Sequence, residues 1–227
     1  MDLVIERGIP MLEAKELYRF FHAGDTETVA LRGVSLTVAA GEIIAVTGPS
    51  GSGKSTLLGC LAGLDEPDAG MVLIGGERLS RRSPQERAQL RARQIGMLFQ
   101  QGNLWDHLTI AGNIATAQRF GNGADTARAA ALLDQLGIRH RADAYPSELS
   151  GGEASRAGLA VALDNEPDVL LADEPTGELD SITAAGVLDL LEEQAANGAA
   201  IVIVTHTDSV ADRADRQIRL RDGLTES

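Results

Sequence analysis

The segment Gly48-Pro49-Ser50-Gly51-Ser52-Gly53-Lys54-Ser55-Thr56 joins a short apolar run, residues 43–47, to a segment with helical spacing, residues 56–64. It fits the pattern G-x-x-x-x-G-K-[ST], which requires a strand before it and a helix after it. Glycines allow the chain to wrap so that successive N–H groups converge on one phosphate, and the helix N-terminus adds partial positive charge. The segment predicts a phosphate-binding loop; the alternative is a flexible glycine- and serine-rich turn.

Two side chains of this loop have the chemistry that a nucleoside triphosphate needs. Lys54 can reach the β- and γ-phosphates, and the Ser55 hydroxyl can bind Mg²⁺. Of the 20 basic residues only Lys54 and Lys15 are lysines, and the others are arginines.

A second candidate site lies where residues 169–172, a continuous apolar run, end at Asp173 and Glu174. A strand beside the loop strand would bring Asp173 close to Mg²⁺, and Glu174 could then orient a water molecule for attack on the γ-phosphate. The alternative is a solvated turn before Pro175, but the phosphate loop upstream favours the catalytic interpretation.

Apolar runs at residues 43–47, 95–99, 169–172 and 201–204 alternate with helical segments, which predicts an α/β domain with a mostly parallel sheet. The region 101–155 breaks this alternation and is expected to be an inserted helical subdomain. The chain is therefore expected to be one domain, with a core of residues 12–100 and 156–227 and an N-terminal extension of residues 1–11.

Composition narrows the possible partners. The chain has 227 residues, 33 acidic and 20 basic side chains and a net charge of −13, so it should repel nucleic-acid backbones. Arginines 81, 82, 87, 91 and 93 are interpreted as a solvated helix face rather than a nucleic-acid site. No apolar run approaches the length of about 20 residues that spans a membrane, and the N-terminus does not resemble a signal peptide.

Five short motifs, in a fixed order, carry a resemblance to a known family. Leu149-Ser150-Gly151-Gly152-Glu153 resembles the L-S-G-G-Q signature of the ATP-binding subunits of ABC transporters. The phosphate loop precedes it, Gln100 matches the Q-loop, Glu178-Leu179-Asp180 matches the D-loop, and His206 matches the switch histidine. The resemblance extends from Leu12 to Leu220.

The resemblance implies a phosphate-loop NTPase core with a mostly parallel sheet, an antiparallel β subdomain and an inserted α-helical signature subdomain. It also implies an ATPase that uses ATP and Mg²⁺, and whose homodimer or pseudo-dimer closes head-to-tail on two nucleotides. The signature of one subunit would serve the nucleotide of the other. The dimer would drive separate membrane permease subunits from the cytoplasmic face of the membrane, as a peripheral protein.

The same resemblance assigns roles to individual residues. Glu174, His206 and Gln100 would be catalytic, and Ser55, Gln100 and Asp173 would bind Mg²⁺. An aromatic side chain ahead of the first long strand would stack on adenine, for which Phe21 fits best by spacing and Tyr18 second. The residues expected to contact nucleotide are Phe21, Gly48, Pro49, Ser50, Gly51, Ser52, Gly53, Lys54, Ser55, Thr56, Ser150, Gly151, Gly152, Glu153 and Asp180.

Within the family, residues 93–104 and 172–180 are most similar to the lipoprotein-releasing and macrolide-exporter ATPases. Two interpretations stay open: a transporter or extruder ATPase, and a signalling ATPase whose permease-like partner transports nothing. Glu153 departs from the family's usual Gln and would add negative charge near the partner's nucleotide. Trp105, which follows the Q-loop, is either a core residue or an anchor for the permease.

Overall fold

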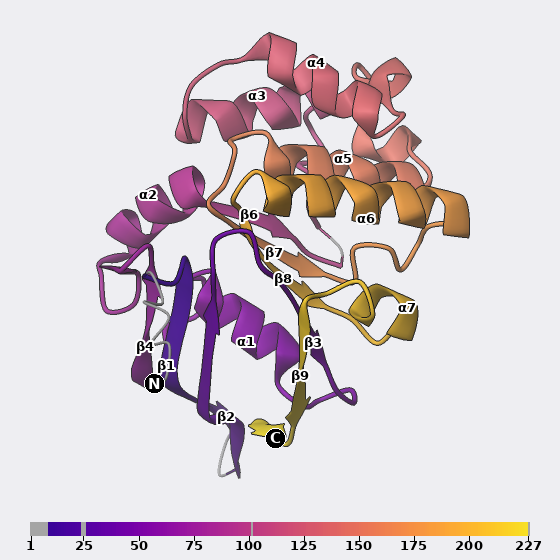
Figure 1. The fold of residues 1–227 in the computed structure, drawn as a ribbon. Coiled ribbons are helices and arrows are strands. Elements are labelled where there is room, and N and C mark those ends of the chain that lie inside the picture. Colours follow the sequence, from indigo (N-terminus) through magenta and orange to yellow (C-terminus); the bar gives the residue numbers. More distant parts are fainter. Residues whose placement is uncertain (1–8, 24–25, 101, 227) are drawn as a thin grey trace, which may run out of the picture.

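Two β-sheets and a helical layer make up the described part of the chain, residues 9–23, 26–100 and 102–226 of a computed structural model (Figure 1). The four-stranded sheet has the order β2-β1-β4-β5 and the six-stranded sheet the order β10-β9-β3-β8-β7-β6. The strands are β1 (Leu12–Ala23), β2 (Thr26–Val38), β3 (Ile43–Thr47), β4 (Ala69–Ile74), β5 (Glu77–Arg78), β6 (Ile95–Leu98), β7 (Val169–Asp173), β8 (Ala200–Val204), β9 (Arg216–Arg221) and β10 (Leu224–Glu226). The helices are α1 (Lys54–Leu61), α2 (Pro84–Gln94), α3 (Ile110–Phe120), α4 (Thr126–Gln135), α5 (Gly151–Leu163), α6 (Ser181–Ala196) and α7 (Asp208–Ala211), with 3₁₀ turns at Arg139–Arg141 and Pro146–Glu148.

Strands β3, β6, β7 and β8 of the six-stranded sheet are buried on both faces, which explains their continuous apolar runs, whereas β9 and β10 are mostly exposed. Strands β6, β7, β8, β3 and β9 are parallel neighbours, and β10 pairs antiparallel with β9. Along β7, Val169 and Leu171 face one core, while Leu170 and Ala172 face the other. Alternation in a strand sends successive side chains to opposite faces, so a sheet between two cores needs apolar residues at every position.

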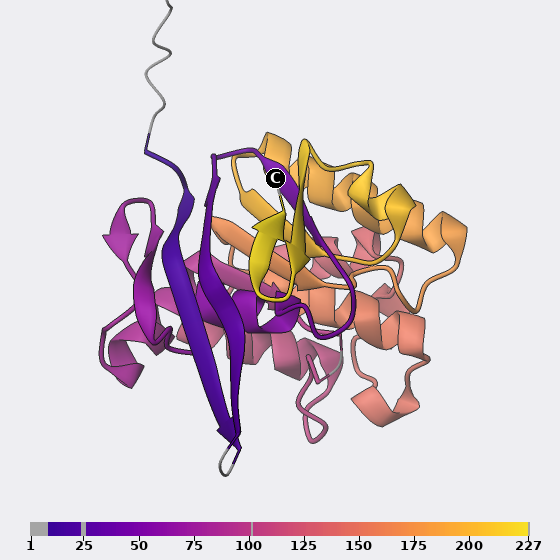
Figure 2. The same ribbon diagram turned by 90° about the horizontal axis from the view of Figure 1, so that it is seen from below.

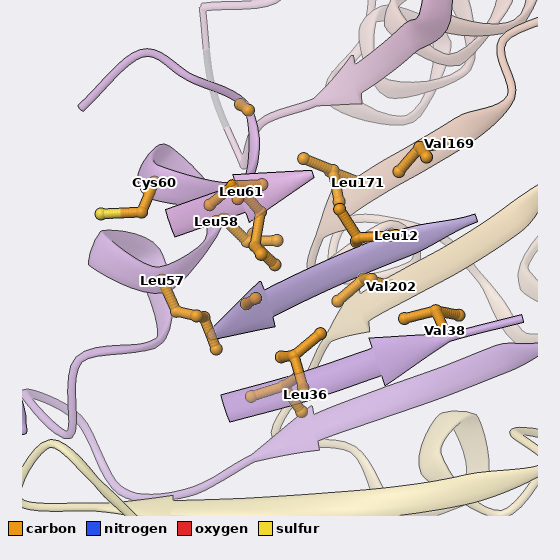
Figure 3. Packing of buried hydrophobic residues seen from close by; sticks show 14 of the residues in the cluster. Leu12, Leu36, Val38, Leu57, Leu58, Cys60, Leu61, Val169, Leu171 and Val202 are labelled. Carbon is orange, nitrogen blue, oxygen red and sulfur yellow. The ribbon is translucent and has the colours of Figure 1, made fainter. Parts of the chain in front are cut away.

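The first core lies around α1, between the two sheets. Figure 3 shows side chains of α1, β1 and β2 gathered with those of β7 and β8 in one cluster. Cys60 is buried in this cluster, where burial raises the pKa of its thiol to about 12, so it behaves as a small apolar residue. Because α1 is fixed from both sides, the loop that precedes it has a rigid support.

The four-stranded sheet is antiparallel throughout (Figure 2). Its strand β1 carries a bulge at Glu16, whose φ is +46°, and the inward positions change from Leu12 and Ala14 to Leu17. The C-terminal turn joins the two sheets, because the N–H of Arg32 donates to the carbonyl oxygen of Gly223 at 2.8 Å.

The second core lies between the parallel sheet and helices α3, α4, α5 and α6, which Figure 1 shows together on one side of the sheet. Residues 101–155 were expected to form the helical insertion, and α3 and α4 do lie there; α5 continues across residue 155 to Leu163. The insertion's boundaries stay a prediction. Residues 1–8 of the expected extension lie outside the described part of the chain.

The expected fold class is confirmed, and the errors are local. The helix expected over residues 56–64 runs over Lys54–Leu61, because the loop lysine already belongs to its first turn. The arginine-rich stretch of residues 80–94 contains the helix α2, which begins at Pro84, so Arg81 and Arg82 of the expected helix face precede the helix. There Arg87 pairs with Glu66 at 2.6 Å and Arg82 with Glu77 at 2.8 Å.

Candidate functional site

The phosphate loop connects β3 to α1 and depends on glycines at two positions of positive φ. Gly48 has a φ of +145°, and a Cβ there would overlap the carbonyl oxygen of Leu220. Gly53, with φ +104°, would direct a Cβ into the carbonyl oxygen of Ala30. Gly51 has no heavy atom within 4 Å of an added Cβ, so the space over the loop is open. The glycines therefore hold the loop against its neighbours and leave room on its outer side.

Lys54 bends back over the loop that precedes it. Its ammonium group donates to the carbonyl oxygens of Gly48 at 2.8 Å and Pro49 at 2.9 Å. Ser52 faces the opposite way: its side chain is buried, and its hydroxyl has no hydrogen-bond partner among the described residues. Of the loop side chains, Lys54 is thus placed over the open space, while Ser52 belongs to the loop's interior.

Ser55 and Asp173 meet at the carboxyl end of the parallel sheet. The Ser55 hydroxyl donates to the Asp173 carboxylate at 3.4 Å. Burial and the neighbouring Glu174 carboxylate raise the pKa of Asp173, and this hydrogen bond and Lys54 only partly oppose them. A half-buried carboxylate whose charge is disfavoured gains from a cation beside it.

Glu174 is held in a fixed orientation by the residues that follow β8. One carboxylate oxygen accepts from the backbone N–H of His206 at 2.9 Å and lies 2.6 Å from the His206 Nδ1. The other oxygen accepts from the hydroxyl of buried Thr205 at 3.2 Å. The backbone of Glu174 has a φ of +50°, which is rare for a residue with a side chain, and its N–H donates to the carbonyl oxygen of Val204 at 2.9 Å.

These groups line one cavity of about 470 Å³. The sequence-predicted residues that share it are Phe21, Gly48, Ser50, Gly51, Gly53, Lys54, Ser55, Thr56, Gln100, Asp173, Glu174 and His206. Pro49 and Ser52 do not line this cavity. Residues Thr28, Val29 and Ala30 of β2 add a wall, apolar at Val29 and Ala30, that the sequence did not indicate.

Phe21 fits the predicted aromatic position better than Tyr18. Phe21 lines the cavity and is partly exposed, and the guanidinium of Arg19 stacks on its ring at 4.8 Å. Tyr18 stacks on Phe20, with ring centroids 6.5 Å apart, and does not line the cavity.

The signature residues and Asp180 lie outside this cavity. Ser150 caps the N-terminus of α5, and its hydroxyl accepts from the backbone N–H of Glu153 at 3.3 Å. Asp180 caps α6 in the same way, through the backbone N–H groups of Ile182 and Thr183 at 3.0 and 3.1 Å. Gly151 lines a neighbouring cavity of about 520 Å³ that also reaches Glu174 and His206. The loop residues and the start of the signature helix therefore line two neighbouring cavities, which share Gln100, Glu174 and His206.

Glu153, the departure from the expected signature, is paired within the chain. Its carboxylate accepts from Arg141 at 2.8 and 3.4 Å, and from the backbone N–H of Ser150 at 2.9 Å. Arg141 foremost, with these Ser150 contacts, lowers the pKa of Glu153 to about 2. No sequence pattern pointed to Arg141. Thr205 could have been suspected only from its position between a buried strand and His206.

Three aromatic side chains beside the Q-loop are exposed. Phe99 is 39% exposed, Trp105 is 59% exposed and Phe120 is 68% exposed. Ile110, by contrast, is buried. An apolar cavity of about 490 Å³ lies between α2, β6, α3 and α5 and includes Phe99 and Phe120. None of the described helices is both long and apolar enough to cross a membrane.

Comparison with known proteins places the chain in a large family. The family model described as ABC transporter matches residues 31–177. A macrolide export ATP-binding/permease protein MacB from Hyphomonas neptunium is 43% identical over 217 residues, which cover 94% of this chain and 34% of that protein. The MacB of Shewanella oneidensis is 42% identical over 219 residues, which cover 95% of this chain and 33% of that protein. The chain therefore spans about a third of the length of these curated relatives.

Solved structures of ATP-binding cassettes have the same fold as this chain. The ATP-binding cassette MJ0796, in a dimeric post-hydrolysis state bound to ADP and Pi, superposes with a TM-score of 0.91 and 35% identity over 96% of this chain and 97% of that chain. An ATP-binding subunit of an ABC transporter superposes with a TM-score of 0.83 at 28% identity, covering 96% of this chain and 88% of that chain.

Proposed function

Because the chain belongs to the ABC transporter family and is an ATPase domain of that family, we propose that it binds Mg-ATP in the phosphate-loop cavity and closes as a head-to-tail dimer to drive a membrane permease. The observation that carries the proposal is the single cavity of about 470 Å³ that joins the loop to Asp173, Glu174, Gln100 and His206. The dimer and permease rest on the resemblance and on the names of the relatives.

The cavity suits a nucleoside triphosphate. Adenine would stack on Phe21, beside the apolar wall of β2, and the phosphates would lie over the open side of Gly51. There they meet the N–H groups at the start of α1 and the Lys54 ammonium. Phosphate oxygens would replace the carbonyl oxygens of Gly48 and Pro49 as acceptors for Lys54, which exchanges neutral acceptors for charged ones.

Mg²⁺ fits beside Ser55 and Asp173. Both offer oxygen ligands, which Mg²⁺ prefers. Burial disfavours the ionised form of Asp173, so a cation beside it would stabilise the carboxylate. The described residues include no cluster of three or more His, Cys, Asp or Glu side chains that could hold a metal ion. The remaining ligands would thus come from phosphate, from water and from Gln100. Bound Mg²⁺ would neutralise charge on the phosphate oxygens.

Glu174 is placed to act on the attacking water. Its carboxylate would accept a proton from the water as the water oxygen attacks the γ-phosphorus and the bond to the β-phosphate oxygen breaks. The contacts from Thr205 and His206 fix the direction in which the carboxylate points. His206, at the cavity's edge, would also contact the γ-phosphate.

Two chains would complete two sites. Within one chain the signature residues Ser150, Gly151 and Gly152 do not line the nucleotide cavity, while Gly151 lines the cavity next to it. The N-terminus of α5 faces that neighbouring cavity, where the Glu178 carboxylate lies beside Gly151, and it would bind an anion brought by another copy. The residue Asp180 would adjoin the same interface.

A permease would dock at the cytoplasmic face of the membrane, on the apolar surface beside the Q-loop. Two observations favour that surface as the docking site: the side chains of Trp105 and Phe120 are exposed, and an apolar groove lies between α2 and α3. The relatives are named ATP-binding/permease proteins, which favours a partner of that kind.

The test is ATP binding and hydrolysis by the wild type and two lysine variants. Lys54→Ala should weaken Mg-ATP binding by at least about tenfold, because it removes a charge-assisted contact to phosphate. Lys15→Ala, which removes the chain's second lysine, on β1 and outside the cavity, should bind ATP as the wild type does. Chelation of Mg²⁺ should abolish hydrolysis. Unchanged ATP binding by Lys54→Ala would reject the assigned cavity.

A further inference from the structure

An ion pair at the start of α5 joins Arg141 to Glu153. The Arg141 guanidinium donates to both carboxylate oxygens of Glu153, at 2.8 and 3.4 Å, and the Glu153 side chain is only 14% exposed. We propose that Arg141 is a positioning residue for the signature site, which holds and neutralises Glu153 so that the N-terminus of α5 can receive the triphosphate of a second copy of this chain. The inference rests on the proposed function.

The need for such a residue follows from charge. A helix N-terminus attracts phosphate through its unpaired N–H groups and partial positive charge. Glu153 puts a full negative charge in the first turn of that helix, beside Ser150. Without a cation the carboxylate would oppose a second anion at the same place. Arg141 neutralises the Glu153 carboxylate, while the Glu178 carboxylate and the Arg156 guanidinium lie beside Gly151 and Gly152 at the start of the same helix.

The Arg141–Glu153 pair also affects the hydrogen bonds that Ser150 can make. The Ser150 hydroxyl donates to the Glu153 carboxylate at 3.0 Å, and the Ser150 N–H donates to the same oxygen at 2.9 Å. A serine has one hydroxyl proton, so Ser150 cannot donate it to a phosphate and to Glu153 together. Because Arg141 also bonds the carboxylate, Glu153 remains satisfied when Ser150 turns to another acceptor.

Arg141 is itself rigidly placed. It lies in the 3₁₀ turn Arg139–Arg141, and its backbone N–H donates to Ile138 at 2.9 Å. The next residue, Ala142, accepts from the N–H of Ala111 in α3 at 2.8 Å. His140 lies farther from Glu153, at 3.8 Å, and is 67% exposed, so Arg141 is the principal cation here. The turn thus presents a fixed guanidinium to α5.

Arg139 provides a matched control within the same turn. It pairs with Asp134 at 3.1 Å, and both side chains are more than half exposed. Arg139→Ala removes the same charge from the same turn without touching α5. General effects of net charge on ATP or on a second chain therefore appear in both variants, whereas the effect proposed here appears only for Arg141.

The experiment measures the Mg-ATP concentration that gives half-maximal dimer, by analytical ultracentrifugation, in a Glu174→Gln parent that binds ATP without turnover. Arg141→Ala should raise this concentration about fivefold or more, as expected for two coupled charges in contact. Arg139→Ala should change it less than about twofold. In a Glu153→Gln background Arg141→Ala should also cost less than about twofold, because no carboxylate remains to be neutralised.

The outcomes distinguish a failure of the Arg141 role from a failure of the proposed function. Binding of ATP to the monomer, measured below the dimerisation threshold, should be equal in all variants, since none touches the phosphate loop. An equal loss from Arg141→Ala with Glu153 and with Glu153→Gln would mean that the arginine acts through the fold, and would overturn this inference alone. A parent that forms no dimer with Mg-ATP would overturn the proposed function, and this inference with it.

Discussion

Asp164 provides a quantitative test of how the helical layer is packed. It follows α5, is only 3% exposed, and neither carboxylate oxygen has a hydrogen-bond partner among the described residues. Burial raises the pKa of Asp164 from 3.8 to about 6, with Asp125 and Glu166 adding to the shift, and Gln118 and Arg128 opposing it. The carboxylate is thus more costly to ionise in the folded than in the unfolded chain.

The sign and size of the effect follow from this difference. A raised acidic pKa leaves the folded state without penalty below pH 3.8, and stability is lost as the pH rises from 3.8 to about 6 and is constant above that. A shift of about two pKa units corresponds to about 3 kcal/mol at pH 8, and to about half of that at pH 5. Asp164→Asn removes the ionisation at nearly constant volume. The variant should be more stable than the wild type by up to these amounts.

The assay is urea unfolding of the wild type and Asp164→Asn at pH 5 and pH 8. We expect the free energy of unfolding to rise in the variant at both values, and by more at pH 8. Asp168→Asn, an exposed carboxylate nearby, should change stability by less than about 0.5 kcal/mol at either pH. A gain that does not depend on pH, or a loss of stability at pH 8, would show that burial does not penalise the ionised Asp164 carboxylate.

Two further variants test the phosphate loop and the carboxylate that faces it. Gly48→Ala places a Cβ against the carbonyl oxygen of Leu220, so the free energy of unfolding should fall by about 2 kcal/mol, as measured by thermal denaturation; an unchanged melting temperature would contradict the loop geometry. His206→Ala removes the ring contact to Glu174 but keeps the backbone N–H contact, so kcat should fall about 10- to 100-fold with KM for ATP within a few fold. Phosphate release at saturating Mg-ATP checks this, and a wild-type kcat would remove His206 from the mechanism.

The loop, the acidic strand end and the parallel sheet could be predicted because each is encoded in adjacent residues. The strand β7 needed apolar side chains on both faces, and its end at Asp173 followed from the same run. The loop required glycine at Gly48 because no side chain fits there. In these places the local pattern and the tertiary environment demand the same residues.

Other features depend on contacts between distant residues, which a sequence pattern does not reveal. Strand β1 escaped prediction because the bulge at Glu16 breaks the alternation between Ala14 and Leu17. Hairpin β9–β10 has mostly polar or charged, exposed residues and shows only a weak pattern of buried positions. The pairing of Arg141 with Glu153 joins residues 12 apart through a 3₁₀ turn, so it required the structure.

The central claim is that two chains close on two nucleotides through signature residues that lie outside the nucleotide cavity of their own chain. Its most direct test is the mass in solution of the Glu174→Gln variant, with Mg-ATP, with Mg-ADP and without nucleotide. The account predicts a dimer with Mg-ATP only, and its loss when Ser150→Arg fills the N-terminus of α5. A monomer under all three conditions, in a variant that still binds Mg-ATP, would contradict it.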